Sequence, residues 1–132
     1  MPNNKKINLW DKLSLLNLIV LLCFKFSYLR RRREFKQLIL SETKRVKLKP
    51  ISAHTLLKYC NFIMNSLFIK SCFTRSLVIQ DILKRWGFAP EIQIGIKNEN
   101  ESFESHCWIK LGDFYNESIG TRNRFKVIDS IQ

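Results

Sequence analysis

The chain has 132 residues, 45% of them hydrophobic and 12% aromatic, and lysine and arginine outnumber aspartate and glutamate by 23 to 11. This length fits one domain, and the apolar content excludes an intrinsically disordered chain. No helix-turn-helix, zinc-finger or aromatic RNA-binding pattern accompanies the net charge of +12, so we expect an anionic membrane or an acidic peptide as a partner, and no nucleic acid.

The N-terminal part, residues 1–50, is predicted to hold an apolar helix and a basic segment. The helix is expected from about Trp10 to Leu40. Its most apolar stretch, Leu13–Phe24, is shorter than the ~20 residues that cross a bilayer. Four arginines at 30–33 follow instead of a signal-peptide cleavage site, which favours a cytoplasmic location. Three alternatives stay open for this helix: docking on a partner protein, peripheral contact with a membrane, and packing on its own domain.

The second part, residues 51–132, begins with two predicted helices. The first covers Ile51–Leu67, where apolar residues recur at helical spacing behind Ser52, a suitable N-cap. The second covers Cys72–Trp86, with one apolar stripe and a polar face, and Gly87 provides its C-terminal stop.

From Glu91 onward the apolar period changes from helical to two, which predicts strands. Since the strands follow one another through short turns, we expect a small antiparallel sheet packed against the second helix, an α+β fold. The expected elements are a strand around Ile92–Ile96, a polar loop at Asn98–Ser102, a strand at Glu104–Leu111, a turn at Gly112-Asp113, a strand at Phe114–Glu117, and a last short strand at Phe125–Ile128.

The four cysteines form neither a CxxC nor a CxxH pair, so we predict no disulfide scaffold and no metal site in a reducing cytoplasm. A small buried side chain is the default expectation for each cysteine. Cys72 differs because it begins a helix, where unpaired N–H groups stabilise a thiolate and can bind an oxyanion. His106, on a later strand, could accept the thiol proton and return it to a leaving amine. From chemistry alone, this thiol–imidazole pair weighs equally with an ordinary strand histidine.

A third group should orient the imidazole. Asn116 and Glu117 lie on the strand that follows His106 through the turn, and cross-strand pairing would bring one of them near the ring. Because neighbouring strand residues face opposite ways, only one of the two is expected to serve. Asp113 is better explained by the turn itself.

Several segments together resemble the transglutaminase-like leader peptidase of lasso-peptide biosynthesis, the B protein. The resemblance covers roughly Ala53 to Glu117, with the motifs in order and sensibly spaced. They are Cys72-Phe73-Thr74-Arg75-Ser76-Leu77, Leu83-Lys84-Arg85-Trp86-Gly87-Phe88, Ile94-Gly95-Ile96 and His106-Cys107-Trp108-Ile109.

The resemblance implies a papain/transglutaminase-like core and a cysteine peptidase that cuts a precursor peptide between leader and core, without a cofactor. Cys72 matches the family nucleophile and His106 its base. The family's third residue is usually an aspartate. Here Asn116-Glu117 stands where an Asn-Asp pair is common, which makes Glu117 the candidate and departs from the pattern.

This chain resembles the split form of the family, in which the leader-recognition domain is a separate protein. The implied partners are that protein, the precursor peptide and the ATP-dependent macrolactam synthetase. Two other functions remain as alternatives: an acyl transferase that uses an amine in place of water, and a non-enzymatic basic module that binds membrane or nucleic acid.

Overall fold

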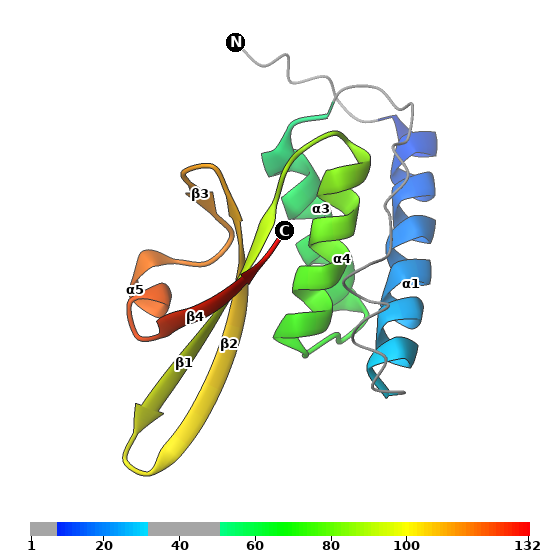
Figure 1. The fold of residues 1–132 in the computed structure, drawn as a ribbon. Coiled ribbons are helices and arrows are strands. Elements are labelled where there is room, and N and C mark those ends of the chain that lie inside the picture. Colours follow the sequence, from blue (N-terminus) through cyan, green and yellow to red (C-terminus); the bar gives the residue numbers. More distant parts are fainter. Residues whose placement is uncertain (1–7, 32–50) are drawn as a thin grey trace.

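The computed structural model describes residues 8–31 and 51–132, with side chains described for all of these but residues 30 and 31. This part of the chain forms a group of helices packed against a four-stranded antiparallel sheet, so the expected α+β class is confirmed (Figure 1). The elements are α1 (Leu9–Arg31), α3 (Ala53–Ser66), α4 (Cys72–Arg85), β1 (Glu91–Glu99), β2 (Ser102–Leu111), β3 (Phe114–Tyr115), α5 (Ile119–Arg122) and β4 (Lys126–Ile131).

Helix α4 is the central element, because it packs against α1 and α3 on one side and against the sheet on the other (Figure 1). The expected apolar stripe is confirmed, since Leu77, Val78 and Ile82 are buried, but the polar side of the helix is not left in solvent: Gln80 and Asp81 are buried as well. Both are polar groups with partners. Gln80 donates from Nε2 to the carbonyl of Ile131 at 3.0 Å, and Asp81 pairs with Arg85 at 3.2 Å. A buried polar group is tolerated when it is hydrogen-bonded in this way.

Helix α1 packs on its own domain, the third of the alternatives left open above. One of its faces joins the same core as α3 and α4 through five buried side chains, Leu15, Ile19, Leu22, Cys23 and Phe26. Its other face exposes large apolar side chains, including Trp10 and Phe24. By length and composition alone, Leu9–Leu29 could also cross a membrane, a test that a core helix or a signal sequence passes equally.

Part of the expected N-terminal organisation lies outside the described residues. The predicted helix extends to Leu40, whereas α1 is described to Arg31. The basic segment, apart from Arg30 and Arg31 at the end of α1, falls in residues 32–50, which are not described, so the division of the chain at residue 50 stays a prediction.

The strands are arranged in the order β3-β2-β1-β4, with every neighbouring pair antiparallel. The loop between β1 and β2 is shorter than predicted, because pairing continues to Glu99 and Ser102. Only Asn100 and Glu101 remain in the turn, and both have positive φ, 50° and 64°. Such a two-residue turn matches the twist of the paired strands and so allows them to extend to their ends.

The third strand is also shorter than predicted, since β3 contains only Phe114 and Tyr115 and pairs with the last two residues of β2. Asn116 and Glu117 lie in a bend after it. As a result, β2 has no strand partner on this side over residues 102–109 within the described part of the chain. We call this stretch the open edge of β2.

The far side of the sheet holds a buried aromatic group. Trp108 is only 1% exposed and donates from Nε1 to Oε1 of Gln93 at 2.9 Å. Its ring lies over Gly95 on the neighbouring strand, where a Cβ atom would be 2.7 Å from the Trp108 ring and 2.8 Å from Phe125. The glycine therefore makes room for the tryptophan, which fixes the local path of β2 next to His106.

Candidate active site

Cys72 is the first residue of α4, and the residue before it makes this start well defined. Ser71 is the N-cap: its backbone is extended, and its Oγ accepts the N–H of Thr74 at 3.3 Å. Its carbonyl accepts the N–H of Arg75 at 3.0 Å. The Cys72 thiol therefore lies in the first helical turn, where the helix dipole favours negative charge.

His106 lies on the open edge of β2 and is held by Glu117. The Nε2 atom of His106 is 2.9 Å from Oε2 of Glu117. The imidazole lies near the rings of Trp108 and Phe125. Its centroid is 6.1 Å from that of Trp108 and 5.5 Å from that of Phe125. Because Nε2 is occupied by the carboxylate, Nδ1 is the ring nitrogen left to serve the thiol.

The bend after β3 brings both Asn116 and Glu117 to the site. We predicted that these two side chains face opposite ways on a strand, and this was wrong because neither is in a strand. Oδ1 of Asn116 accepts a hydrogen bond from the N–H of Ile109 at 2.7 Å, and the backbone N–H of Asn116 donates to the Ile109 carbonyl at 3.1 Å. Asn116 thus fastens the bend to β2, and Glu117 is the residue that contacts His106.

A further contact holds Glu117 from the other side. Nε of Arg122 donates to the Glu117 carbonyl at 3.2 Å, and the Arg122 guanidinium stacks 3.5 Å above the ring of Tyr115. The backbone of Glu117 is thus held through Asn116 on one side and through Arg122 on the other. This limits the movement of the carboxylate and of the imidazole that it binds.

Cys107 makes the closest sulfur contact of the site. Its Sγ donates to Sγ of Cys72 at 3.3 Å, the only hydrogen bond between two cysteines within residues 8–31 and 51–132. Cys107 is 7% exposed and faces the helices, as the strand alternation predicts. The sequence pattern could not indicate that α4 begins directly over it.

The electrostatics favour a charged thiolate–imidazolium pair. The hydrogen bond from the Cys107 side chain lowers the pKa of Cys72; burial opposes this, while the Cys107 backbone N–H and His106 add to the lowering. Burial lowers the pKa of His106, but hydrogen bonds with Glu117 and Cys72 and the charges of both groups outweigh it and raise the pKa. The pKa of Cys107 is raised, first by its hydrogen bond to Cys72 and then by burial. Cys107 thus stays a protonated donor when Cys72 is ionised.

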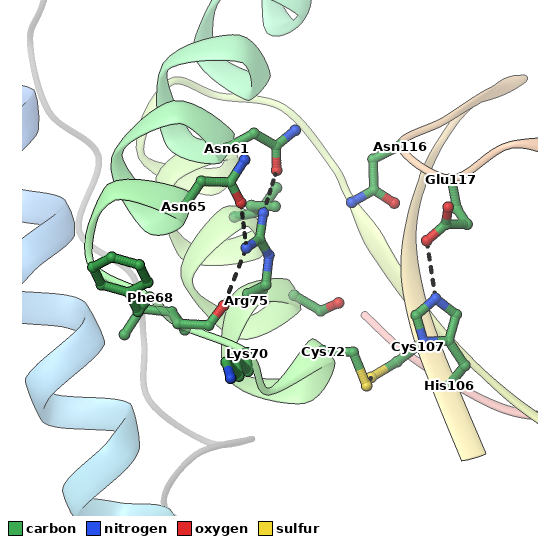
Figure 2. A pocket seen from close by; sticks show the side chains of 13 residues that line it. Asn61, Asn65, Phe68, Lys70, Cys72, Arg75, His106, Cys107, Asn116 and Glu117 are labelled. Atoms are coloured by element: carbon green, nitrogen blue, oxygen red, sulfur yellow. Dashed lines mark hydrogen bonds and ion pairs between the residues drawn. The ribbon is translucent and has the colours of Figure 1, made fainter. Parts of the chain in front are cut away.

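These groups open onto a cleft of about 670 Å³ (Figure 2). Cys72, His106 and Glu117 lie along one side of it, and Asn61, Asn65 and Arg75 lie across from them. Arg75 donates to Oδ1 of Asn65 at 2.8 Å, to Oδ1 of Asn61 at 3.2 Å and to the Ile69 carbonyl at 3.1 Å. Since both Asn oxygens are engaged, the two amide NH₂ groups remain as donors.

Asn61 and Asn65 in this opposite wall were not predicted from the sequence. Asn61 and Asn65 are four residues apart and so share one face of α3, a signal that was present but that carries no chemistry by itself. Phe68, at the rim, gave no sequence signal at all, because its exposure depends on where α3 ends. Among the described residues, no cluster of three metal-ligating side chains occurs.

The chain matches a known protein family. A model described as the transglutaminase-like superfamily matches residues 18–130. No curated protein and no solved structure matches the chain.

The lowered pKa of Cys72 predicts a distinctive pH profile for alkylation. Only the thiolate reacts, so the iodoacetamide rate at Cys72 should reach its plateau at a lower pH than for an ordinary thiol of pKa about 8.5. In Cys107→Ala the S–H donor is lost, and the midpoint should move to higher pH. Peptide-resolved mass spectrometry measures both, with Cys60, whose pKa burial raises to about 12, as a slow internal reference. Equal midpoints in the two proteins would contradict this role of Cys107.

Proposed function

The chain belongs to the transglutaminase-like superfamily, and from this premise we propose that it is a cysteine peptidase that removes the leader from a lasso-peptide precursor. The observation that carries the proposal is the arrangement of thiol, imidazole and carboxylate: Cys72 at a helix start and His106 beside it, held by Glu117 at 2.9 Å. These are the three groups that a thiol hydrolase requires.

The reaction follows from the positions of these groups. The Cys72 thiolate attacks the carbonyl at the leader–core junction, and the oxyanion that forms is stabilised at the first turn of α4. His106 donates a proton to the leaving amine, which releases the core peptide and leaves the leader as a thioester on Cys72. A water molecule, deprotonated by His106, then hydrolyses the thioester. Glu117 keeps the imidazole oriented and stabilises its positive charge during both steps.

The cleft wall opposite the thiol suits an extended peptide. Asn61 and Asn65 offer amide donors toward backbone carbonyls, and Arg75 fixes their orientation. Lys70 also lines the cleft, and Glu117, the only acidic residue there among those that the structure describes, is engaged with His106. The basic character of the wall favours a substrate with acidic or carbonyl-rich segments near the cut.

The same machinery would serve an acyl transferase that hands the leader to an amine, and the mass of the product distinguishes the two reactions. For the peptidase, we propose as partners a separate leader-recognition protein and the macrolactam synthetase that closes the ring. A cytoplasmic location belongs to this proposal, and so does peripheral membrane contact through the exposed face of α1.

Substitution of the three groups tests the proposal. With a lasso precursor and the recognition protein present, Cys72→Ala and His106→Ala should lower the rate of leader removal by at least about 10³-fold. The decrease in rate caused by Glu117→Gln should be roughly 10–100-fold smaller than the decrease caused by Cys72→Ala, because the substitution removes an orienting group and not a reacting one. Liquid chromatography with mass detection follows the product, and circular dichroism checks the fold. Normal processing by Cys72→Ala would refute the proposal.

Phe68 provides a test of substrate binding that separates function from stability. Phe68 directly follows the end of α3, at a position that glycine normally occupies, and its φ is 55°. The N–H of Phe68 donates to the Asn65 carbonyl, and the N–H of Ile69 donates to the Met64 carbonyl. Phe68 is also 82% exposed at the rim of the cleft. Positive φ costs a bulky residue about 1–2 kcal/mol.

We therefore expect Phe68→Gly to raise the free energy of unfolding by about 1 kcal/mol while raising KM for the precursor roughly tenfold. Phe62→Ala is the matched control, since Phe62 is 71% exposed but does not line the cleft. Urea titration and initial rates give the two quantities. An unchanged KM in Phe68→Gly would show that Phe68 does not bind substrate.

A further inference from the structure

Cys107 does more than adjoin the candidate nucleophile: it is placed to form a covalent bond with it. The two sulfur atoms are 3.3 Å apart, whereas a disulfide requires ~2.05 Å, so the atoms must approach by only ~1.2 Å. The two residues come from elements in direct contact, the first turn of α4 and β2. Rotation of the two side chains can supply such a movement without unfolding either element.

The two thiols also differ in the way that an oxidation sequence requires. Both thiols line the cleft, but Cys72 is partly exposed, whereas Cys107 is buried behind it and only 7% exposed. An oxidant therefore reaches Cys72 first. Redox-sensitive cysteines in general combine thiolate character, access and a second cysteine nearby, and Cys72 has all three.

We propose that Cys72 and Cys107 are a redox pair, in which a hydroperoxide oxidises Cys72 and Cys107 then closes a reversible disulfide that switches the site off. This inference rests on the proposed function only for its effect on catalysis. The disulfide itself depends on the geometry of the two sulfurs alone.

The steps balance as follows. The Cys72 thiolate attacks the peroxide, an S–O bond forms and the O–O bond breaks, so that Cys72 becomes a sulfenic acid. The departing alkoxide or hydroxide takes a proton from the His106 imidazolium and leaves as an alcohol or as water. Cys107 then attacks that sulfur: an S–S bond forms, the S–O bond breaks, and the hydroxide leaves as water with the proton of the Cys107 thiol. A cellular dithiol reverses the bond by thiol–disulfide exchange.

The consequence for the site is protection as well as inhibition. While the disulfide exists, Cys72 cannot attack a peptide. Without a partner thiol, continued peroxide would convert the sulfenic acid to sulfinic acid, which dithiols do not reverse. In a reducing cytoplasm such a bond is transient, as expected of a redox-sensing pair.

The remaining cysteines provide internal controls. Cys23 and Cys60 are both buried in the helical core, 4% and 1% exposed, and burial raises the pKa of each. Neither lines the cleft that contains Cys72. Their oxidation by a brief peroxide pulse should therefore lag well behind that of Cys72.

The test uses the reduced full-length protein and a brief pulse of hydrogen peroxide, followed by intact-mass analysis and peptide mapping. Wild type should lose about 2 Da, with the Cys72 peptide linked to the Cys107 peptide, and dithiothreitol should restore both mass and Cys72 alkylation. Cys107→Ser should instead gain about 32 Da at Cys72 and remain modified after dithiothreitol. Cys60→Ala should behave like wild type. Each variant is compared with its own untreated sample.

Two results would overturn the proposal: a disulfide that involves Cys23 or Cys60 in place of Cys107, or full dithiothreitol recovery of Cys72 in Cys107→Ser. Mass and alkylation are read without any substrate, so they stand apart from the proposed peptidase activity. A disulfide in a protein that cleaves no precursor would support the redox pair and refute the peptidase. Cleavage of the precursor by a protein that forms no disulfide would support the peptidase and refute the redox pair.

Discussion

The contact between the first turn of α4 and the open edge of β2 is the constraint on which the site depends. Because β3 ends after two residues, β2 has no strand partner on this side at His106 and Cys107 within the described part of the chain. The N-terminus of α4 packs against β2 at this point, and Sγ of Cys107 donates to Sγ of Cys72 at 3.3 Å. A longer β3 would occupy this edge with its own backbone. The shortness of one strand thus makes room for the thiol.

The bend that ends β3 has a second effect, since it brings the carboxylate to the imidazole. Asn116 replaces one residue of strand pairing with a side-chain hydrogen bond, so the chain can leave the sheet without losing its hold on β2. Glu117 follows at once and reaches His106 with the longer of the two acidic side chains. A glutamate therefore fits the geometry of this bend, in which the backbone has already turned away from the strand.

Much of this arrangement could be predicted from the sequence. The start of α4 at Cys72 follows from helical periodicity, and the position of His106 on a strand follows from period two. What could not be predicted are features that depend on how elements meet. The polar side of α4 is buried because the helix lies between two layers, and hydrogen bonds to Ile131 and Arg85 compensate its polar groups. The sulfur contact with Cys107 depends on the crossing of a helix over a strand, which no local pattern records.

We propose that Cys72 carries the leader as a thioester during cleavage, and hydroxylamine trapping tests this most directly. Precursor, recognition protein and enzyme are mixed with hydroxylamine, which attacks a thioester in competition with water. We predict that part of the released leader then carries a C-terminal hydroxamate, identified by its mass, and that the fraction rises with hydroxylamine concentration. Leader release at the normal rate with a free carboxylate at every hydroxylamine concentration would contradict the claim, because it would mean that water attacks the peptide bond directly.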